Sequence, residues 1–468
     1  VLGQIDYDTL TNTQKELALN NVNLIKEKRD GKVKGRTCAN GSTQRSYVPR
    51  EEARSPTMSL EALMALLIIF AHEKRATAVF DVPGAYPHAD MPKGKFALLR
   101  VTGQFVDIVC EVNPEFKQDV RYENGTKVLY ARILKAIYGM IESALLWYEL
   151  YVTVLLDEGY EINQYDKCVA NKIITGKQCT IGWYVDDNII GHEDKTVIDD
   201  QIAKIEAKFP GLAVQKGPNL DFLGMELHFR KDRKVDIGTV QFLKKMIQEF
   251  EEDTGVALNR MYATPGAAWL FKIKDSKELC PKFTGFFQKF VMKVLWTSKR
   301  SRPDLETTMG FLTTRVKSPT KDDWHKLTRL MCFIRATVND VRIIGADNLH
   351  NLLTMIDSAH AVHEKDMRGH TGSITTMGTG VLDSKSSKQK MNTRSSTETE
   401  FVGNSEALPK TIFRCHFMEE QGYKIKWNVL AKDNKSEIKL LKNGRDSCTW
   451  NSKHIAIKYV WVTDRIKD

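Results

Sequence analysis

With 468 residues, 42% of them apolar and 27% charged, the chain is long enough for roughly two to four domains with packed cores. This composition excludes a long disordered chain, and the formal net charge of +10 favours a polyanionic partner such as nucleic acid. The longest apolar run, residues 62–71, covers about half a bilayer span and is typical of a core helix.

The eight cysteines are scattered, and no Cys-x-x-Cys pair occurs. The sequence therefore predicts neither a zinc site nor a disulfide framework, and reduced thiols are typical of a cytosolic or nuclear protein. We find no signal peptide, and the chain starts at Val1, as a fragment or a polyprotein product would.

The first hundred residues alternate between helical and extended patterns. Charged residues over 9–30 predict a helix, followed by a stretch rich in Gly, Lys and Arg at 30–45. Apolar residues predict a strong helix within 55–73. A run of β-formers then ends at Asp81, where a Pro-Gly pair breaks the strand.

Residues 96–133 predict a hairpin region with a turn at 122–126, and residues 142–160 predict a helix. A second hairpin is predicted over 179–192, where β-formers flank the adjacent Asp186 and Asp187. This pair is either a solvated hairpin tip or a rigid pair of carboxylates that binds a divalent metal.

Beyond the second hairpin, residues 197–209 predict a helix and residues 220–230 a strand. The region from about 240 to 345 is predicted to be helical, with Thr320 as an N-cap and Asp323 three residues later.

Strand patterns return after residue 350 and lead to a predicted helix at 397–421 and a strand near 427–434. This C-terminal part is thus predicted to be a second mixed α/β unit with acidic residues of its own.

Three aspartates suit a two-metal site. Phosphoryl transfer to a 3′-hydroxyl uses two Mg²⁺ ions roughly 3.5–4 Å apart, and Mg²⁺ prefers a few carboxylates with water and phosphate. Asp81 at a strand end and Asp186 and Asp187 at a hairpin tip form such a set. Crowded like charges are tolerable where a cation joins them.

Short motifs in one order carry a family resemblance: KGRTCANGSTQ, FDVPGAY, KAIYGMIESALLWY, YVDD, FLGMEL, SKRSRPDL and SSTETEFVG. They resemble, collinearly over nearly the whole chain, the polymerase and ribonuclease H segments of copia-type (Pseudoviridae) retrotransposon Pol polyproteins. FDVPGAY resembles motif A of reverse transcriptases and YVDD resembles motif C. A mild departure is Ala144, where the family pattern usually has Pro.

The resemblance implies roles for individual residues. Asp81, Asp186 and Asp187 would ligate two Mg²⁺ ions, with Mn²⁺ as an alternative, and Tyr86 would exclude a ribose 2′-hydroxyl. The implied substrate-binding residues are Lys34 and Arg36 at the triphosphate, Tyr138 and Gly139 at the nucleotide, and Phe222, Leu223 and Gly224 in a primer-gripping turn.

Simpler interpretations stay open for the substrate-binding residues. Tyr86 would otherwise be a core tyrosine, Lys34 and Arg36 solvated loop residues, and residues 222–224 part of an ordinary packed strand.

The C-terminal unit resembles the ribonuclease H domain of the same polyproteins. Asp357, Glu400 and Asp433 match three of the four carboxylates of its two-metal cluster, and the alternative for each is a surface acid. The segment that carries the fourth carboxylate in the family has no match: Ala456 replaces a commonly acidic position, and Asp464 lies too early in the register. We therefore expect a C-terminally truncated domain of uncertain ribonuclease H activity, in which His454 either assists product release or lies on the surface.

The implied fold is α+β: a right-hand polymerase with fingers and palm in residues 1–235, a mostly helical thumb and connection in 236–348, and a ribonuclease H-like α/β domain in 349–468. The main hypothesis is an RNA-directed DNA polymerase. The alternatives are an inactive nucleic-acid-binding relic and an RNA-dependent RNA polymerase, against which Tyr86 and the YVDD form argue.

The implied partners are an RNA template, a DNA primer, RNA–DNA hybrid and dNTPs. Other polyprotein segments such as an integrase are also expected, and a membrane is not. The expected location is the cytoplasm, in virus-like particles, or the nucleus.

Overall fold

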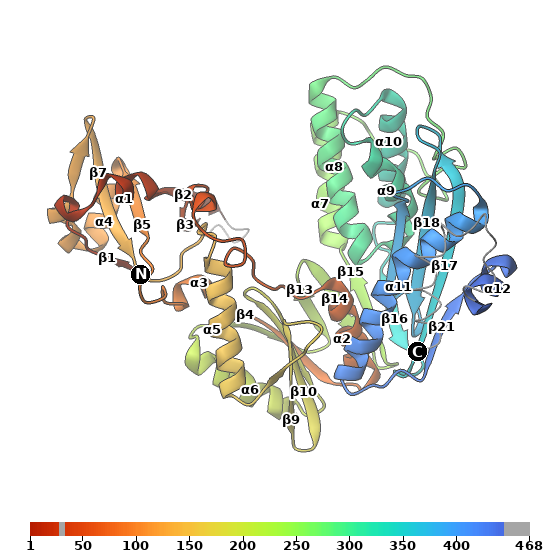
Figure 1. The fold of residues 1–468 in the computed structure, drawn as a ribbon, viewed down its shortest axis with the longest axis horizontal. Helices are drawn as coiled ribbons and strands as arrows, with labels where there is room; N and C mark the ends of the chain where they lie inside the picture. Colours follow the sequence, from red (N-terminus) through yellow and green to blue (C-terminus); the bar gives the residue numbers. More distant parts are fainter. Residues whose placement is uncertain (28–32, 444–468) are drawn as a thin grey trace.

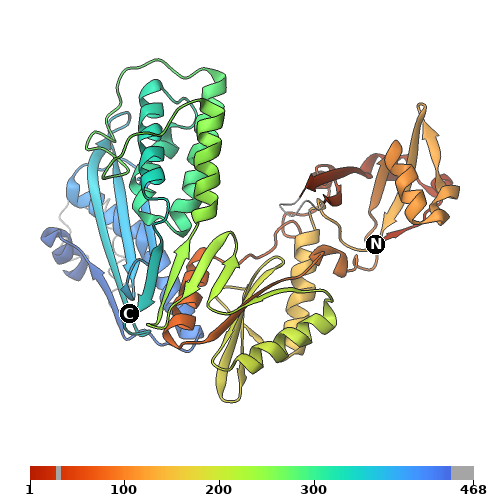
Figure 2. The ribbon, with the colours of Figure 1, turned by 180° about the vertical axis from the view of Figure 1, so that it is seen from behind.

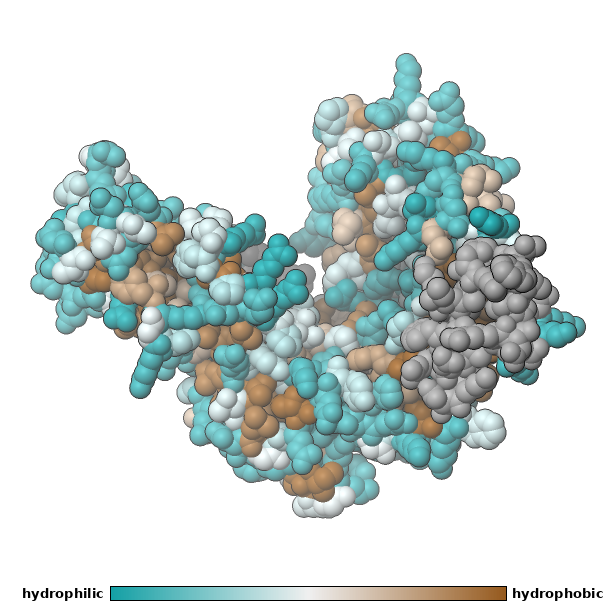
Figure 3. Space-filling model, in the orientation of Figure 1, coloured by the Kyte–Doolittle hydropathy of each residue, from teal (hydrophilic) through white to brown (hydrophobic). Residues whose placement is uncertain are grey.

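The computed structural model describes residues 1–27 and 33–443. An N-terminal lobe and a lobe rich in helices stand on either side of a central region (Figures 1 and 2). Figure 3 shows a wide hollow between the two lobes, with a largely hydrophilic rim. No helix within the described residues is long and apolar enough to cross a membrane.

The N-terminal lobe is built on a six-stranded sheet in the order β1-β7-β5-β2-β3, with β6 paired to β7. Its strands are β1 (Leu2–Gly3), β2 (Leu19–Glu27), β3 (Val33–Ala39), β5 (Leu98–Thr102), β6 (Arg121–Glu123) and β7 (Thr126–Ile133). Its helices are α1 (Asn12–Leu17) and α4 (Gln104–Val112), with 3₁₀ turns at Tyr7–Thr9, Thr43–Ser46 and Pro114–Asp119.

The helix predicted over 9–30 is wrong. Of the described residues 10–27, only those of α1 are helical, and the chain then turns into β2, which pairs with β3 from Asn21 to Glu27. The Asn residues of β2 disfavour a helix and its β-branched residues favour a strand, and the charged pattern that suggested a helix reflects exposure of the β2–β3 ribbon.

The turn predicted at 122–126 is confirmed. Asn124 and Gly125 both have positive φ, 50° and 75°, which is the backbone of a tight hairpin turn between β6 and β7. Helix α4 was not predicted, because its amphipathic segment lies within residues 96–133, whose pattern suggested a hairpin.

The central sheet has the order β12-β4-β11-β10-β9-β8. Its strands are β4 (Ala76–Asp81), β8 (Glu161–Ile162), β9 (Val169–Ile174), β10 (Lys177–Tyr184), β11 (Asp187–His192) and β12 (Ala213–Lys216). Helices α2 (Leu60–His72), α3 (Ala85–His88), α5 (Ser143–Asp157) and α6 (Lys195–Lys208) surround it (Figure 1). The predictions of α2, α5, α6 and the β10–β11 hairpin are confirmed.

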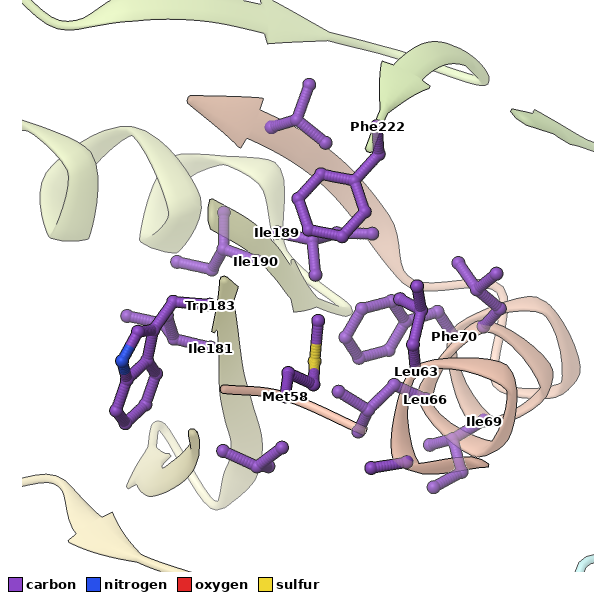
Figure 4. Close-up of a cluster of buried hydrophobic side chains, with 14 of the residues drawn as sticks. Met58, Leu63, Leu66, Ile69, Phe70, Ile181, Trp183, Ile189, Ile190 and Phe222 are labelled. Carbon is purple, nitrogen blue, oxygen red and sulfur yellow. The ribbon is translucent and has the colours of Figure 1, made fainter. Parts of the chain in front are cut away.

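Helix α2 packs closely on the strands that carry the Asp-Asp turn. A Cβ on Gly182 would come within 2.9 Å of the Met58 sulfur, and one on Gly191 within 2.8 Å of the Phe70 ring. Figure 4 shows α2 side chains such as Leu66 against the side chains of β10 and β11. Glycine is therefore required on both strands for this approach, and the packing holds the hairpin rigidly.

A second sheet continues from the central region in the order β13-β14-β15-β16-β19. Its strands are β13 (Asn219–Phe222), β14 (Met225–Phe229), β15 (Lys234–Gly238), β16 (Arg342–Ala346) and β19 (Gly378–Thr379). Between the paired strands β15 and β16 the chain forms the helical lobe. This lobe comprises α7 (Val240–Thr254), α8 (Pro281–Arg300), α9 (Glu306–Leu312) and α10 (Lys321–Ala336), with 3₁₀ turns at Pro303–Leu305 and Thr313–Arg315.

The predicted cap of α10 is confirmed as a reciprocal capping box. The Asp323 carboxylate accepts from the Thr320 backbone N–H at 2.8 Å, and the Thr320 hydroxyl accepts from the Asp323 backbone N–H at 3.4 Å. Such a cap stabilises a helix by about 1 kcal/mol.

The C-terminal unit has a four-stranded sheet in the order β20-β18-β17-β21, in which β17 and β21 run parallel. The strands are β17 (Asn351–His363), β18 (Arg368–Thr376), β20 (Asp383–Lys388) and β21 (Trp427–Ala431). The predicted helix at 397–421 is present as α11 (Ser396–Glu420), and α12 (Lys435–Asn443) follows β21.

Polar contacts join the C-terminal unit to α2 and its flank. Lys410 of α11 pairs with Glu61, and the Tyr423 hydroxyl accepts from Arg75 at 3.2 Å. The C-terminal unit thus rests on the side of the central sheet.

Candidate metal centres

The β10–β11 hairpin ends in a two-residue turn that holds Asp186 at its tip. Tyr184 and Asp187 are paired across the turn, and Val185 adopts a φ of +59°. This conformation is strained for a β-branched residue, and such strain persists only where the surroundings hold it in place. Trp147 of α5 does so by donating its indole N–H to the Val185 carbonyl at 2.7 Å.

A buried chain of hydrogen bonds fixes the other side of the turn. The Asn188 amide donates to the Asp186 carbonyl at 2.8 Å, and the Tyr151 hydroxyl donates to the Asn188 side-chain oxygen at 2.6 Å. The Asp186 carbonyl also accepts from the Val82 backbone N–H at 3.0 Å. The turn and the end of β4 are thereby tied together.

The end of β4 and the hairpin turn bring the three aspartates to the same edge of the sheet. Asp81 at the end of β4 stands opposite Asp187 on β11 in the sheet register, and Asp186 precedes Asp187. Burial, followed by the charges of Asp186 and Asp81, raises the pKa of Asp187 to about 6. A cavity of about 380 Å³ opens beside Asp81 and Asp187. Hard carboxylate oxygens suit a divalent cation such as Mg²⁺, although the ligand oxygens of these three aspartates do not all lie within 4.8 Å of one another.

Aromatic and basic side chains lie next to these carboxylates. The rings of Tyr86 and Tyr138 are 4.8 Å apart between centroids, and the Arg36 guanidinium lies 4.9 Å from the Tyr138 ring centroid. Burial raises the pKa of both tyrosines, and the charge of Asp186 adds to the effect. The structure therefore brings three predicted substrate-binding residues to the aspartates. The Lys34 side chain is outside the described part of the chain.

Gly139 has a φ of +89°, and a Cβ there would lie 2.0 Å from the Ala39 carbonyl oxygen of β3. The Ala39 backbone N–H in turn donates to the Tyr138 carbonyl at 2.7 Å. The close backbone approach at Gly139 is thus to the N-terminal sheet, which joins that sheet to the central region.

Residues 220–230 do not form the single strand that was predicted. Leu223 and Gly224, with φ of +49° and +75°, make a tight turn between β13 and β14. A Cβ on Gly224 would lie 3.2 Å from the Trp296 ring of α8. Phe222 is a buried core residue (Figure 4) that also lines the cavity beside Asp81. The turn therefore links the aspartates to the helical lobe.

A second acidic cluster lies in the C-terminal unit. Ligand oxygens of Asp357 on β17, Glu400 on α11 and Asp433 after β21 all lie within 4.8 Å of one another. Among residues 1–27 and 33–443 no other group of three His, Cys, Asp or Glu ligands is so close. Asp357 and Asp433 line a cavity of about 740 Å³. In spacing and donor type this cluster also suits a divalent metal.

Two residues of the second cluster were missed from the sequence. The Lys432 ammonium lies 2.5 Å from a Glu400 oxygen and 3.2 Å from a Glu437 oxygen. Burial raises the pKa of Glu437 to about 7. Of this segment only Asp433 matched a carboxylate of the family motif, so Lys432 and Glu437 were not predicted to belong to the site.

Comparisons with known proteins decide the family. Residues 7–259, a stretch that contains Asp81, Asp186 and Asp187, match the family model described as "Reverse transcriptase (RNA-dependent DNA polymerase)". The chain belongs to this family. The resemblance to copia-type Pol proteins is confirmed by the relatives. The chain is 23% identical over 461 residues to the retrovirus-related Pol polyprotein from transposon TNT 1-94 of Nicotiana tabacum, covering 95% of this chain.

This reverse transcriptase is also 23% identical over 442 residues to the transposon Ty1-GR2 Gag-Pol polyprotein of Saccharomyces cerevisiae, covering 91% of the chain. It spans 32% of the tobacco protein and 24% of the yeast protein. A solved structure of a foamy viral protease-reverse transcriptase in complex with double-stranded DNA matches with a TM-score of 0.54 and 12% identity, over 100% of this chain and 70% of that one. The described residues thus share the mixed α+β fold of that reverse transcriptase structure.

A polar pair inside the quoted motifs was also missed. The fully buried Gln44 donates to the Glu142 carboxylate at 3.0 Å and accepts from the Ile141 backbone N–H at 2.8 Å. Gln44 lies in the motif KGRTCANGSTQ and Glu142 in KAIYGMIESALLWY, and these positions were the only indication of the pair in the sequence. In the reverse transcriptase this pair joins the N-terminal lobe to the start of α5. Ala456, His454 and Asp464 lie outside the described residues.

Proposed function

We propose that this chain is the RNA-directed DNA polymerase of a copia-type retrotransposon, which extends a primer 3′-hydroxyl with dNTPs by two-metal phosphoryl transfer. The observation that carries the proposal is the register of Asp81 opposite Asp187, with Asp186 at a rigid turn tip. Membership of the reverse transcriptase family supports it.

In this proposal Asp81, Asp186 and Asp187 hold two Mg²⁺ ions, with Mn²⁺ as an alternative. The bound ions would lower the pKa of the 3′-hydroxyl and stabilise charge on the phosphate. The Asp187 carboxyl, whose pKa is raised by burial and by its charged neighbours, must lose its proton before it can serve as a ligand.

Side chains around the aspartates orient the nucleotide. Tyr86, packed on Tyr138, forms the wall that excludes a ribose 2′-hydroxyl. Arg36 presents a planar guanidinium to the triphosphate, with Lys34 of the same strand as its proposed neighbour. Gly139 keeps β3 against this wall, and the Phe222–Leu223–Gly224 turn supports the primer end.

The lobes take the parts of a right hand: fingers and palm over 1–235, thumb and connection over 236–348. The hollow between the N-terminal lobe and the helical lobe (Figure 3) is the proposed channel for an RNA template paired with a DNA primer. Phosphate contacts dominate such duplex binding, and the net charge of +10 suits them. Other polyprotein segments, among them an integrase, are the proposed protein partners, and the proposed location is the cytoplasm, in virus-like particles, or the nucleus.

We propose further that residues 349–468 are a ribonuclease H-like domain that holds the RNA–DNA hybrid, with Asp357, Glu400 and Asp433 as its metal ligands. The closeness of their oxygens supports this. The Lys432 ammonium contacts Glu400, which does not fit a fully acidic metal cluster. We therefore assign no catalytic step to this cluster.

The test is extension of an oligo-dT primer on poly-rA with dTTP and Mg²⁺. The unmutated chain should incorporate dTMP, and Asp186→Asn should reduce the rate by at least about 1,000-fold, because one metal ligand is lost. Asp199→Asn, which changes an exposed acid on α6, serves as the matched control. Equal melting temperatures of the variants exclude misfolding.

Absence of incorporation by the unmutated chain, with binding to poly-rA/oligo-dT intact, would contradict the proposal and support the relic. Preference for UTP over dTTP would support an RNA polymerase instead.

A further inference from the structure

The ammonium group of Lys432 is a buried cation inside the C-terminal acidic cluster. Its side chain is 2% exposed, and its two carboxylate partners, Glu400 and Glu437, are 7% and 0% exposed. A lysine is rarely buried this deeply unless it is paired, and here both neighbours are anions.

Both oxygens of Glu400 are already engaged. One accepts from the Ser358 backbone N–H at 3.2 Å, and the other accepts from Lys432 at 2.5 Å. A divalent ion bound by Glu400, Asp357 and Asp433 must therefore share a carboxylate with an ammonium, and the two cations repel each other at close range.

The ammonium is held in place from its far side. Glu437 accepts from the Asn404 side-chain amide, and its backbone N–H donates to the Asn434 side chain at 3.1 Å. Because Glu437 is anchored at α11 and at the start of α12, Lys432 has a fixed partner that keeps it beside Glu400.

We propose that Lys432 is an internal cation that replaces part of the metal charge at the Asp357–Glu400–Asp433 cluster, so that this cluster binds divalent ions weakly. The inference rests on the proposed metal role of these three residues and does not depend on polymerase activity. At Mg²⁺ concentrations that fill the Asp81–Asp186–Asp187 site, the C-terminal cluster remains largely metal-free.

Mn²⁺ binding tests this in the full chain with Asp186→Asn and Asp187→Asn, which remove binding at the first site. The readouts are titration of free Mn²⁺ by electron paramagnetic resonance and the Mn²⁺-dependent rise in melting temperature. The double variant Lys432→Met/Glu437→Gln removes the ammonium and the Glu437 charge, so that Glu400 is left for the metal, and Gln can still accept from Asn404. Its Mn²⁺ Kd should be at least ten-fold lower than that of the background chain.

Two further variants separate the ion pair from general charge effects. Lys432→Arg keeps the cation and should keep the weak Kd. Lys385→Met removes a lysine that lines the same cavity but pairs with Glu406, and should change the Kd less than three-fold.

An unchanged Kd in the double variant, or an equal gain in Lys385→Met, would overturn the role of Lys432 and leave the metal cluster standing. Absence of Mn²⁺ binding in every variant, with folded proteins by melting, would overturn the metal role of the cluster as well.

Discussion

The two acidic clusters of this reverse transcriptase differ in how their charge is balanced. At the hairpin turn, burial and the charges of Asp186 and Asp81 raise the pKa of Asp187 to about 6, so the ionised form of Asp187 is destabilised there. In the C-terminal unit, Lys432 lies against Glu400 and offsets part of the negative charge. The first cluster thus has more to gain from an external cation than the second.

The largest effect is expected from a substitution that removes a carboxylate from the first cluster. Asp187→Asn should lower dTMP incorporation on poly-rA/oligo-dT by at least about 1,000-fold, because a neutral amide is a poor Mg²⁺ ligand. Asp357→Asn, the matched change in the second cluster, should leave incorporation within about two-fold. A comparable loss in both variants would show that the clusters do not act separately.

The pH dependence of incorporation sharpens the same contrast. Asp187 is ionised above its raised pKa of about 6 and protonated below it, and a protonated carboxyl does not bind the metal. The rate of incorporation should therefore fall about ten-fold per pH unit below pH 6. Because metal and proton compete, ten-fold more Mg²⁺ should move this limb to lower pH.

A rate that is flat between pH 7 and pH 5 at low Mg²⁺ would contradict the raised pKa. Binding of the template–primer, measured at the same pH values by fluorescence anisotropy, controls for loss of the substrate.

Sequence patterns singled out the carboxylates of the first cluster because each stands at a recognisable place, a strand end or a hairpin tip, although Asp81 lies about a hundred residues before the Asp186–Asp187 pair. A strand that ends at Asp81 and a hairpin with Asp186 and Asp187 at its tip need only one sheet register to meet. The second cluster was predicted only in part. Lys432 and Glu437 are near neighbours in sequence, but their role depends on Glu400, which α11 brings from more than thirty residues away.

The wrong predictions of secondary structure have a similar cause. Residues 21–27 are extended because β3 pairs with them, and Leu223 adopts positive φ because it stands in the two-residue turn where β13 pairs with β14. Neither partner is visible in a local pattern. Tertiary contacts therefore override the local preference in both segments.

A smaller effect is expected from the residues that hold the hairpin turn. Tyr151→Phe removes the hydroxyl that donates to Asn188 at 2.6 Å and leaves a buried oxygen without its donor. We expect a loss of about ten-fold in kcat, little change in the KM for dTTP, and about 1–3 kcal/mol lower stability in denaturant unfolding.

Tyr148→Phe is the control, since that hydroxyl bonds only the Lys167 carbonyl at an exposed site. If Tyr151→Phe loses stability but retains full kcat, the buried chain holds the fold without positioning Asp186.

The smallest expected effect is on thermal stability, and it depends directly on the charge difference between the clusters. The folded-state pKa of Asp187, about 6, lies above its ordinary value of 3.8, so its protonation favours the folded state. This contribution is present below about pH 4 and is lost as the pH rises through 6. At pH 8 without metal, Asp187→Asn should therefore melt slightly higher than the unmutated chain, and the difference should vanish at pH 4. Mg²⁺ at ten times its Kd adds about 1.4 kcal/mol, or about 1–2 °C, to the unmutated chain and should add much less to Asp187→Asn. Differential scanning calorimetry measures both shifts, and an equal Mg²⁺ shift in the two proteins would place the bound ion elsewhere than at Asp187.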